Sequence, residues 1–65
     1  MKNEARMKEA MKKQLERVAY CYDRCDYLAQ DSFLHPERKA ANDMEIARLS
    51  GEADVRSYIL GLNDS

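Results

Sequence analysis

The sequence predicts an all-α protein, folded as a helical hairpin in which one long helix packs on one or two shorter helices. Glycine and proline are absent before Pro36, so the first thirty or so residues can form one uninterrupted helix. Apolar residues recur at helical spacing on both sides of that proline. Charged residues make up 35% of the chain, as expected for the solvated faces of amphipathic helices.

A chain of 65 residues forms at most one domain, which we expect to span residues 1–65. In so short a chain, the burial of apolar surface only just offsets the conformational entropy lost on folding. Disulfides, a metal ion or a second copy of the chain usually supply the missing stability. Two cysteines one helical turn apart do not make a disulfide framework. We therefore expect the hairpin to be completed by homodimerisation.

The first helix is predicted over residues 3–31. Seven apolar residues follow one another at intervals of four, four, three, four, three and four residues. At about 100° per residue they fall within an arc of roughly 80°, and their average spacing approaches the 3.5-residue period of a coiled coil. Gln14, Cys21 and Leu28 widen this arc on one side. The predicted seam consists of Met7, Met11, Leu15, Val18, Tyr22, Cys25 and Ala29.

A second helix is predicted over residues 36–49. Proline suits a first helical turn because its missing N–H has no partner to lose, and Glu37 suits the positive end of the helix dipole. Phe33 and Leu34, just before this helix, are too apolar for an idle loop, and we expect them to plug the end of the core.

The second helix carries two apolar surfaces. Ala40, Met44 and Ala47 form its predicted core stripe, in which the alanines permit close approach to the first helix. Ile46 and Leu49 point away from that stripe and are expected to meet a second chain.

Ser50 and Gly51 predict a helix end, because glycine readily adopts the left-handed conformation that follows a last turn. A third helix then covers residues 52–62, with a stripe of Val55, Tyr58, Ile59 and Leu62. The alternative is one helix over residues 36–62, which would cost only about 1 kcal/mol for the interior glycine.

The residues that could carry chemistry are few. Cys21, Cys25 and His35 are the only soft metal ligands, whereas a closed zinc site needs four. We therefore predict no metal and no cofactor, and treat both cysteines as core residues. With one histidine, no phosphate-binding glycine loop and too little mass to enclose a pocket, the chain is predicted not to be an enzyme.

The side of the first helix that is almost opposite the predicted seam combines two tyrosines with three bases. Tyrosine and arginine are enriched where the binding energy of interfaces concentrates, so we predict a protein-binding strip. Cover by the third helix or by a second chain is the alternative interpretation. The same strip could also stack on unpaired bases of RNA or single-stranded DNA. The strip consists of Lys13, Arg17, Tyr20, Arg24 and Tyr27.

Self-association is assigned to the middle of the predicted seam and to the second apolar surface. The residues concerned are Leu15, Val18, Tyr22, Ile46 and Leu49.

Residues 45–51 resemble the first helix and turn of a helix-turn-helix, in which an alanine stands four residues before the turn glycine, as Ala47 stands before Gly51. This resemblance implies a small transcriptional regulator that uses residues 45–60. The sequence departs from the pattern at Glu52, a position that is usually apolar, and the helix after the turn begins with acids that would face phosphates. Nucleic-acid binding is therefore not the favoured interpretation.

Charge divides the chain in two. Residues 1–19 carry a net charge of +3 and residues 20–65 a net charge of −4, which favours head-to-tail or antiparallel pairing. The N-terminus is charged and no segment is apolar enough to span a membrane, so we expect a cytoplasmic protein. Together these features predict a small regulatory or inhibitory protein that binds a surface of a larger protein.

Overall fold

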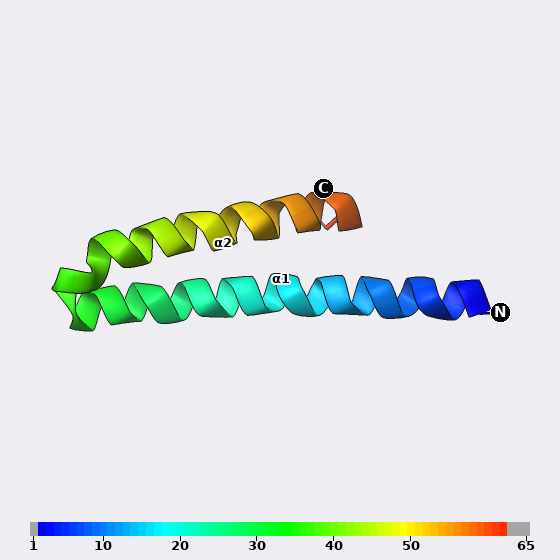
Figure 1. Cartoon of the computed structure of the whole chain (residues 1–65), viewed down its shortest axis with the longest axis horizontal. Coiled ribbons are helices and arrows are strands. Elements are labelled where there is room, and N and C mark those ends of the chain that lie inside the picture. Colours follow the sequence, from blue (N-terminus) through cyan, green and yellow to red (C-terminus); the bar gives the residue numbers. More distant parts are fainter. Residues whose placement is uncertain (1, 63–65) are drawn as a thin grey trace.

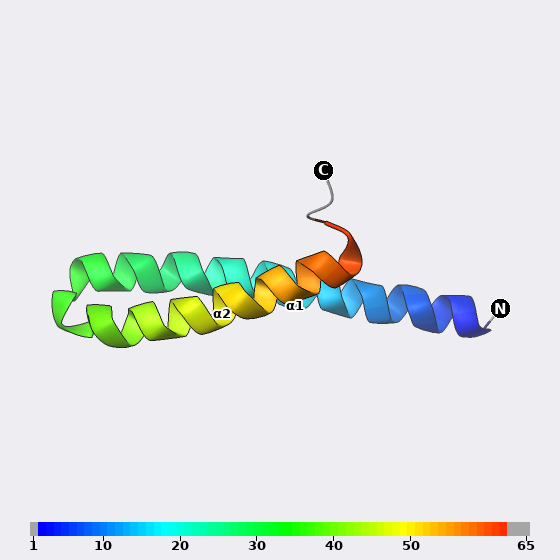
Figure 2. The ribbon, with the colours of Figure 1, turned by 90° about the horizontal axis from the view of Figure 1, so that it is seen from above.

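Two antiparallel helices joined by a tight turn form the structure. The computed structural model describes residues 2–62, in which α1 spans Lys2–Leu34, the 3-10 turn η1 spans Pro36–Arg38 and α2 spans Lys39–Leu60. α2 folds back along α1, and the N-terminal part of α1 projects beyond the end of α2 (Figure 1). Seen from above, the two helices cross at a shallow angle (Figure 2). The predicted all-α helical hairpin is confirmed.

The turn begins later than the sequence predicts. α1 continues to Leu34, three residues past the predicted end, and the backbone N–H of His35 still donates to Asp31 O at 2.7 Å. His35 then leaves the helical region (φ −133°, ψ 79°), as expected for a residue before Pro36. Phe33 lies in the last turn of α1 and is 85% exposed, and Leu34 is 69% exposed. The prediction that these two residues plug the core is therefore wrong.

A single helix replaces the two helices predicted over residues 36–49 and 52–62. α2 runs without a break through Ser50 and Gly51. The interior glycine costs about 1 kcal/mol, but the unbroken helix keeps Ala53 and Ser57 buried against α1. Packing of this face therefore outweighs the local preference of glycine, and the alternative of one long helix is closer to the structure.

The glycine stop occurs ten residues later. Gly61 has a left-handed conformation (φ 77°), its N–H donates to Tyr58 O at 3.1 Å, and the N–H of Leu62 donates to Ser57 O at 2.9 Å. These two bonds are the Schellman arrangement, which satisfies carbonyls that have no partner within the helix. The left-handed helix end that the sequence predicts at Gly51 is thus found at Gly61.

The core is a narrow line of side chains between the helices. α1 contributes three buried apolar residues and α2 contributes two, and one partly buried residue from each helix packs against them. A core of so few residues buries little apolar area. The set is Val18, Cys21, Leu28, Leu49 and Ala53, with Cys25 and Ile46 at its edge.

The buried face of α1 is rotated by about 60° from the centre of the predicted seam, toward Cys21 and Leu28. Val18 and Cys25 belong to both faces. The rest of the seam remains exposed in this structure, namely Met7, Met11, Leu15, Tyr22 and Ala29.

The core stripe predicted for the second helix is also wrong. Ala40, Met44 and Ala47 are exposed, whereas Leu49 is buried and Ile46 is half-buried against α1. The face of α2 that packs on α1 instead carries Leu49, Ala53 and Ser57, with Ile46 at its edge.

Polar contacts close the hairpin at its turn. Asn42 Nδ2 donates to Asp31 Oδ2 at 2.9 Å, to Ser32 Oγ at 3.1 Å and to Leu28 O at 3.3 Å. Arg38 Nη1 donates to the other oxygen of Asp31 at 3.0 Å. The hydrogen bond from Asn42, followed by the charge of Arg38, lowers the pKa of Asp31. These contacts connect the end of α1 to the beginning of α2.

The two glycines predict opposite responses to alanine. A Cβ at Gly51 meets nothing within 4 Å, so Gly51→Ala should raise the free energy of unfolding by about 0.5–1 kcal/mol. Gly61→Ala should lower it by about 1 kcal/mol, because an alanine at φ 77° is strained. Urea denaturation followed by circular dichroism measures both. A destabilising Gly51→Ala would contradict the continuous helix.

Candidate protein-binding surface

The tyrosines of the predicted strip lie on the surface of α1. Tyr20 is 49% exposed and Tyr27 is 55% exposed, so α2 does not cover them. Lys13 and Arg24 are exposed beside them, and Arg17 lies at the edge of the helix interface. The structure thus brings the five predicted residues together on one side of the hairpin.

Each tyrosine is stacked with the arginine that lies three residues before it. The guanidinium carbon of Arg17 lies 4.9 Å from the centre of the Tyr20 ring, and that of Arg24 lies 4.8 Å from the centre of the Tyr27 ring. Such contacts between a cation and an aromatic face are favourable at these distances. Seven residues separate the two pairs, so two similar Arg–Tyr stacks lie about 10 Å apart along α1.

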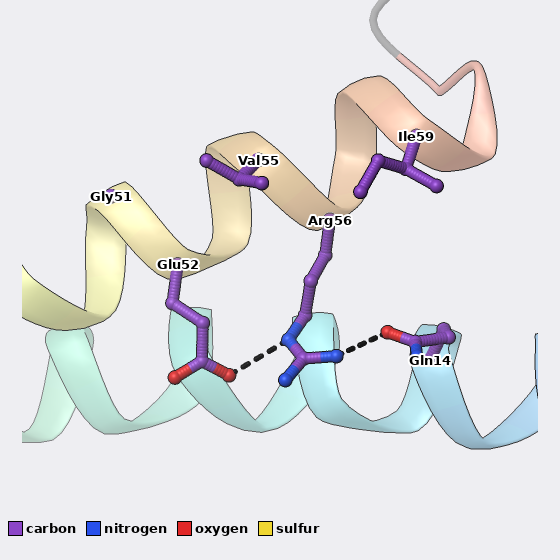
Figure 3. Close-up of a pocket in the computed structure, with 6 residues that line it drawn as sticks. All are labelled: Gln14, Gly51, Glu52, Val55, Arg56 and Ile59. Carbon is purple, nitrogen blue, oxygen red and sulfur yellow. Dashed lines mark hydrogen bonds and ion pairs between the residues drawn. The ribbon is translucent and has the colours of Figure 1, made fainter.

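Arg17 also joins the two helices. Its Nε donates to Glu52 Oε2 at 2.5 Å and its Nη2 donates to Glu52 Oε1 at 3.0 Å, a two-point contact between guanidinium and carboxylate. Arg56 Nε donates to the same Glu52 at 2.9 Å, and its Nη1 donates to Gln14 Oε1. Figure 3 shows Glu52 and Arg56 reaching from α2 toward α1, while Val55 and Ile59 do not. We call Gln14, Arg17, Glu52 and Arg56 the polar clamp.

The polar clamp holds Glu52 in its charged form. The hydrogen bonds from Arg17, followed by the one from Arg56, lower the pKa of Glu52 from 4.5 to about 2, and Glu52 in turn raises the pKa of Arg17. Cys21 lies in the core beside this pair, and burial is the main reason that the pKa of its thiol is raised. Cys21 is therefore a neutral core residue here, as predicted for a buried cysteine.

Sequence reasoning did not identify the polar clamp. It placed Glu52 at the start of a separate helix, where an acid is explained by the helix dipole alone. In one continuous α2, Glu52 and Arg56 are one turn apart and directly flank Leu49 and Ala53. The helix break was therefore the error that concealed the clamp.

Two cations of the strip remain available to a partner. Lys13 makes no hydrogen bond or ion pair with any residue of the described range 2–62. Arg24 stacks on Tyr27, and its charge contributes to the lowered pKa of Glu45 only after that of Arg48. Arg17, in contrast, already has its carboxylate partner within the chain.

The residues predicted for self-association divide into two groups. Val18 and Leu49 are buried, and Ile46 packs against the same core, so these three belong to the interior of one chain. Leu15 is 44% exposed and Tyr22 is 46% exposed. Only these last two can contact a second copy of the folded hairpin.

The three candidate metal ligands do not form one group, because His35 lies away from the two cysteines. Cys21 and Cys25 are free thiols on the inner face of α1, and His35 lies at the turn, with Nδ1 3.9 Å from Glu37 Oε2. Within residues 2–62, no three His, Cys, Asp or Glu side chains are grouped as metal ligands would be. In the same range, neither helix is long and apolar enough to cross a membrane.

The helix-turn-helix resemblance has no counterpart in the backbone. Residues 45–51 lie within α2, which continues beyond them to Leu60. A helix-turn-helix requires a turn between its two helices, so residues 45–60 do not form that motif.

Comparisons of this chain with protein-family models, curated proteins and solved structures found no match.

The polar clamp predicts a specific response to acid. Because the pKa of Glu52 is lower in the folded state, its contribution to stability is complete above about pH 4.5 and is lost as the pH falls toward 2. Glu52→Gln should therefore have a lower urea midpoint than wild type at neutral pH, and the two midpoints should converge near pH 2. Glu16→Gln, at an exposed carboxylate of α1, is the control and should match wild type throughout. A Glu52→Gln deficit that is equally large at pH 2 would contradict the charged pair.

Proposed function

We propose that this protein is a non-catalytic regulatory or inhibitory module that binds a surface of a larger protein through the strip on α1. The pair of Arg–Tyr stacks, repeated at an interval of seven residues on an exposed helix face, carries this proposal. Tyrosine and arginine are the residues that most often supply the binding energy of protein interfaces.

The geometry of the strip supports binding because some of its side chains are already held in place before a partner binds. Arg17 is held by Glu52 through two hydrogen bonds, and Tyr20 rests on its guanidinium group. Groups that are already positioned lose less conformational entropy on association. Tyr20 therefore acts as an anchor on a rigid support.

The chemistry of the strip also describes its partner. Tyr20 and Tyr27 offer apolar rings with hydroxyl edges, and Lys13 and Arg24 offer two charges that are not engaged by a carboxylate in the same way as Arg17. A complementary surface presents two apolar sites about 10 Å apart, flanked by carboxylates.

The proposal includes a homodimer in the cytoplasm. The described core contains only five buried apolar residues, which is little for a 65-residue chain to fold on alone. Two free cysteines are consistent with a reducing compartment.

Removal of both rings tests this function. Tyr20→Ala combined with Tyr27→Ala should abolish retention of the partner in a pull-down from native lysate, because truncation of an interface anchor costs about 2 kcal/mol or more. Helicity should be unchanged, since both rings are about half exposed. Tyr58→Ala, which removes a more exposed ring from the opposite helix, is the matched control and should retain the partner.

A protein retained by wild type and Tyr58→Ala but lost from the double variant would support the proposal. Equal retention by all three proteins would show that the strip is not the binding surface. Loss of helicity in the double variant would instead assign the tyrosines to the fold.

Nucleic acids provide an independent test of the alternative functions. We expect no binding to mixed-sequence DNA or RNA at physiological salt. A dissociation constant below about 1 μM, rising steeply with salt as counterions are released, would contradict this expectation.

A further inference from the structure

A second exposed feature runs along α1, on the other side of the buried line from Arg17. It is formed by apolar residues of the predicted seam that α2 leaves uncovered, continued by Phe33. At about 100° per residue these side chains share an arc of roughly 80°, and the stripe is about 39 Å long. We call this set the outer stripe: Met7, Met11, Leu15, Tyr22, Ala29 and Phe33.

An apolar surface of this length is unusual on a monomer, where exposed apolar patches are small and scattered. The hairpin also has a very thin core, so it gains stability if the outer stripe is covered. Since α2 packs on the neighbouring face of α1, no element of the described hairpin covers the outer stripe.

Charges along the free margin of the outer stripe show which chain fits. Lys8 and Lys12 lie on this margin in the first half of α1, and Asp23 and Asp26 lie on it in the second half. All four are exposed, and none forms an ion pair with another residue of the described range. The margin thus carries these two lysines in the first half of α1 and these two aspartates in the second half.

Such a margin is complementary to itself when two copies run in opposite directions. In a parallel two-fold pair, the free margin of one α1 faces the α2 side of the other, so its lysines and aspartates would not meet each other. In an antiparallel pair centred between Val18 and Ala19, Leu15 comes opposite the partner's Tyr22, and Lys12 comes within one residue, about 1.5 Å along the axis, of the partner's Asp26. Each of these contacts occurs twice by symmetry.

We infer that the outer stripe is the homodimer interface, in which α1 packs antiparallel on α1 of a second copy with Leu15 facing the partner's Tyr22 and Lys12 close to the partner's Asp26. This inference rests on the proposed homodimer and gives its surface, direction and register. Tyr20 and Tyr27 lie roughly 150° around α1 from the centre of the outer stripe, so dimerisation leaves the protein-binding strip accessible.

A charge-exchange experiment tests the direction and the register. Lys12→Asp and Asp26→Lys should each raise the dimer dissociation constant about tenfold, because each change turns two exposed attractive pairs into two repulsive ones. The combined variant Lys12→Asp with Asp26→Lys restores both pairs in reversed order and should dimerise within about threefold of wild type. Sedimentation equilibrium gives the constants, with a monomer mass of 7.6 kDa.

Matched controls separate this contact from a general effect of charge. Arg6→Asp makes the same change of charge on the side of α1 away from the outer stripe and should leave the dissociation constant unchanged. Circular dichroism should show full helicity in every variant, since Lys12 and Asp26 are exposed. High salt should reduce the differences between the variants, because it screens exposed charges.

The outcomes distinguish the register from the homodimer itself. Restoration in the combined variant supports the antiparallel register. A wild-type dimer whose combined variant stays as weak as the single variants overturns the register but leaves the homodimer standing. A wild-type protein that remains a 7.6 kDa monomer at about 100 μM overturns both, since a dimer interface of useful strength associates at that concentration.

Discussion

A structure of two helices gives each helix only one neighbour, and this constraint explains most features of the molecule. Each helix can bury one narrow face, so the core is reduced to a single line of residues from Val18 to Leu28 on α1 and from Ile46 to Ser57 on α2. Hydrogen bonds and ion pairs flank that line, with Asn42 near the turn and Glu52 farther along the hairpin. The face of α1 that a third helix would cover therefore remains exposed.

The long first helix and the turn at Pro36 could be predicted from the sequence, because the absence of glycine and proline before Pro36 leaves few other choices. The orientation of the helices about their own axes could not. Apolar residues extend over more than half of the circumference of α1, and only the position of α2 decides which part is buried. The helix end predicted at Gly51 was wrong for a similar reason. The local sequence suggests a break there, but it does not show that Ala53 and Ser57 pack against α1.

The candidate surface was partly predictable. Tyr20 and Tyr27 lie far from both the predicted and the observed buried face, so a rotation of about 60° leaves them exposed. Arg17 lies between these regions, and the same rotation moves it from the open surface to the edge of the helix interface, where Glu52 meets it. Residues near the border of a buried face are therefore the ones whose roles the sequence alone defines least.

Contacts between the two helices join residues that are farther apart in the sequence the farther they lie from the turn. These contacts join residues 14 apart near the turn, as in Asn42 and Leu28, then 21 apart between Cys25 and Ile46, 35 apart in Arg17 and Glu52, and 42 apart in Gln14 and Arg56. The entropy needed to close a loop rises with its length, so contacts form most readily at the turn and open most readily at the far end. The hairpin therefore opens first at the end far from the turn. Arg17, which supports Tyr20, lies toward that end, so amide hydrogens there exchange sooner than those beside Asn42.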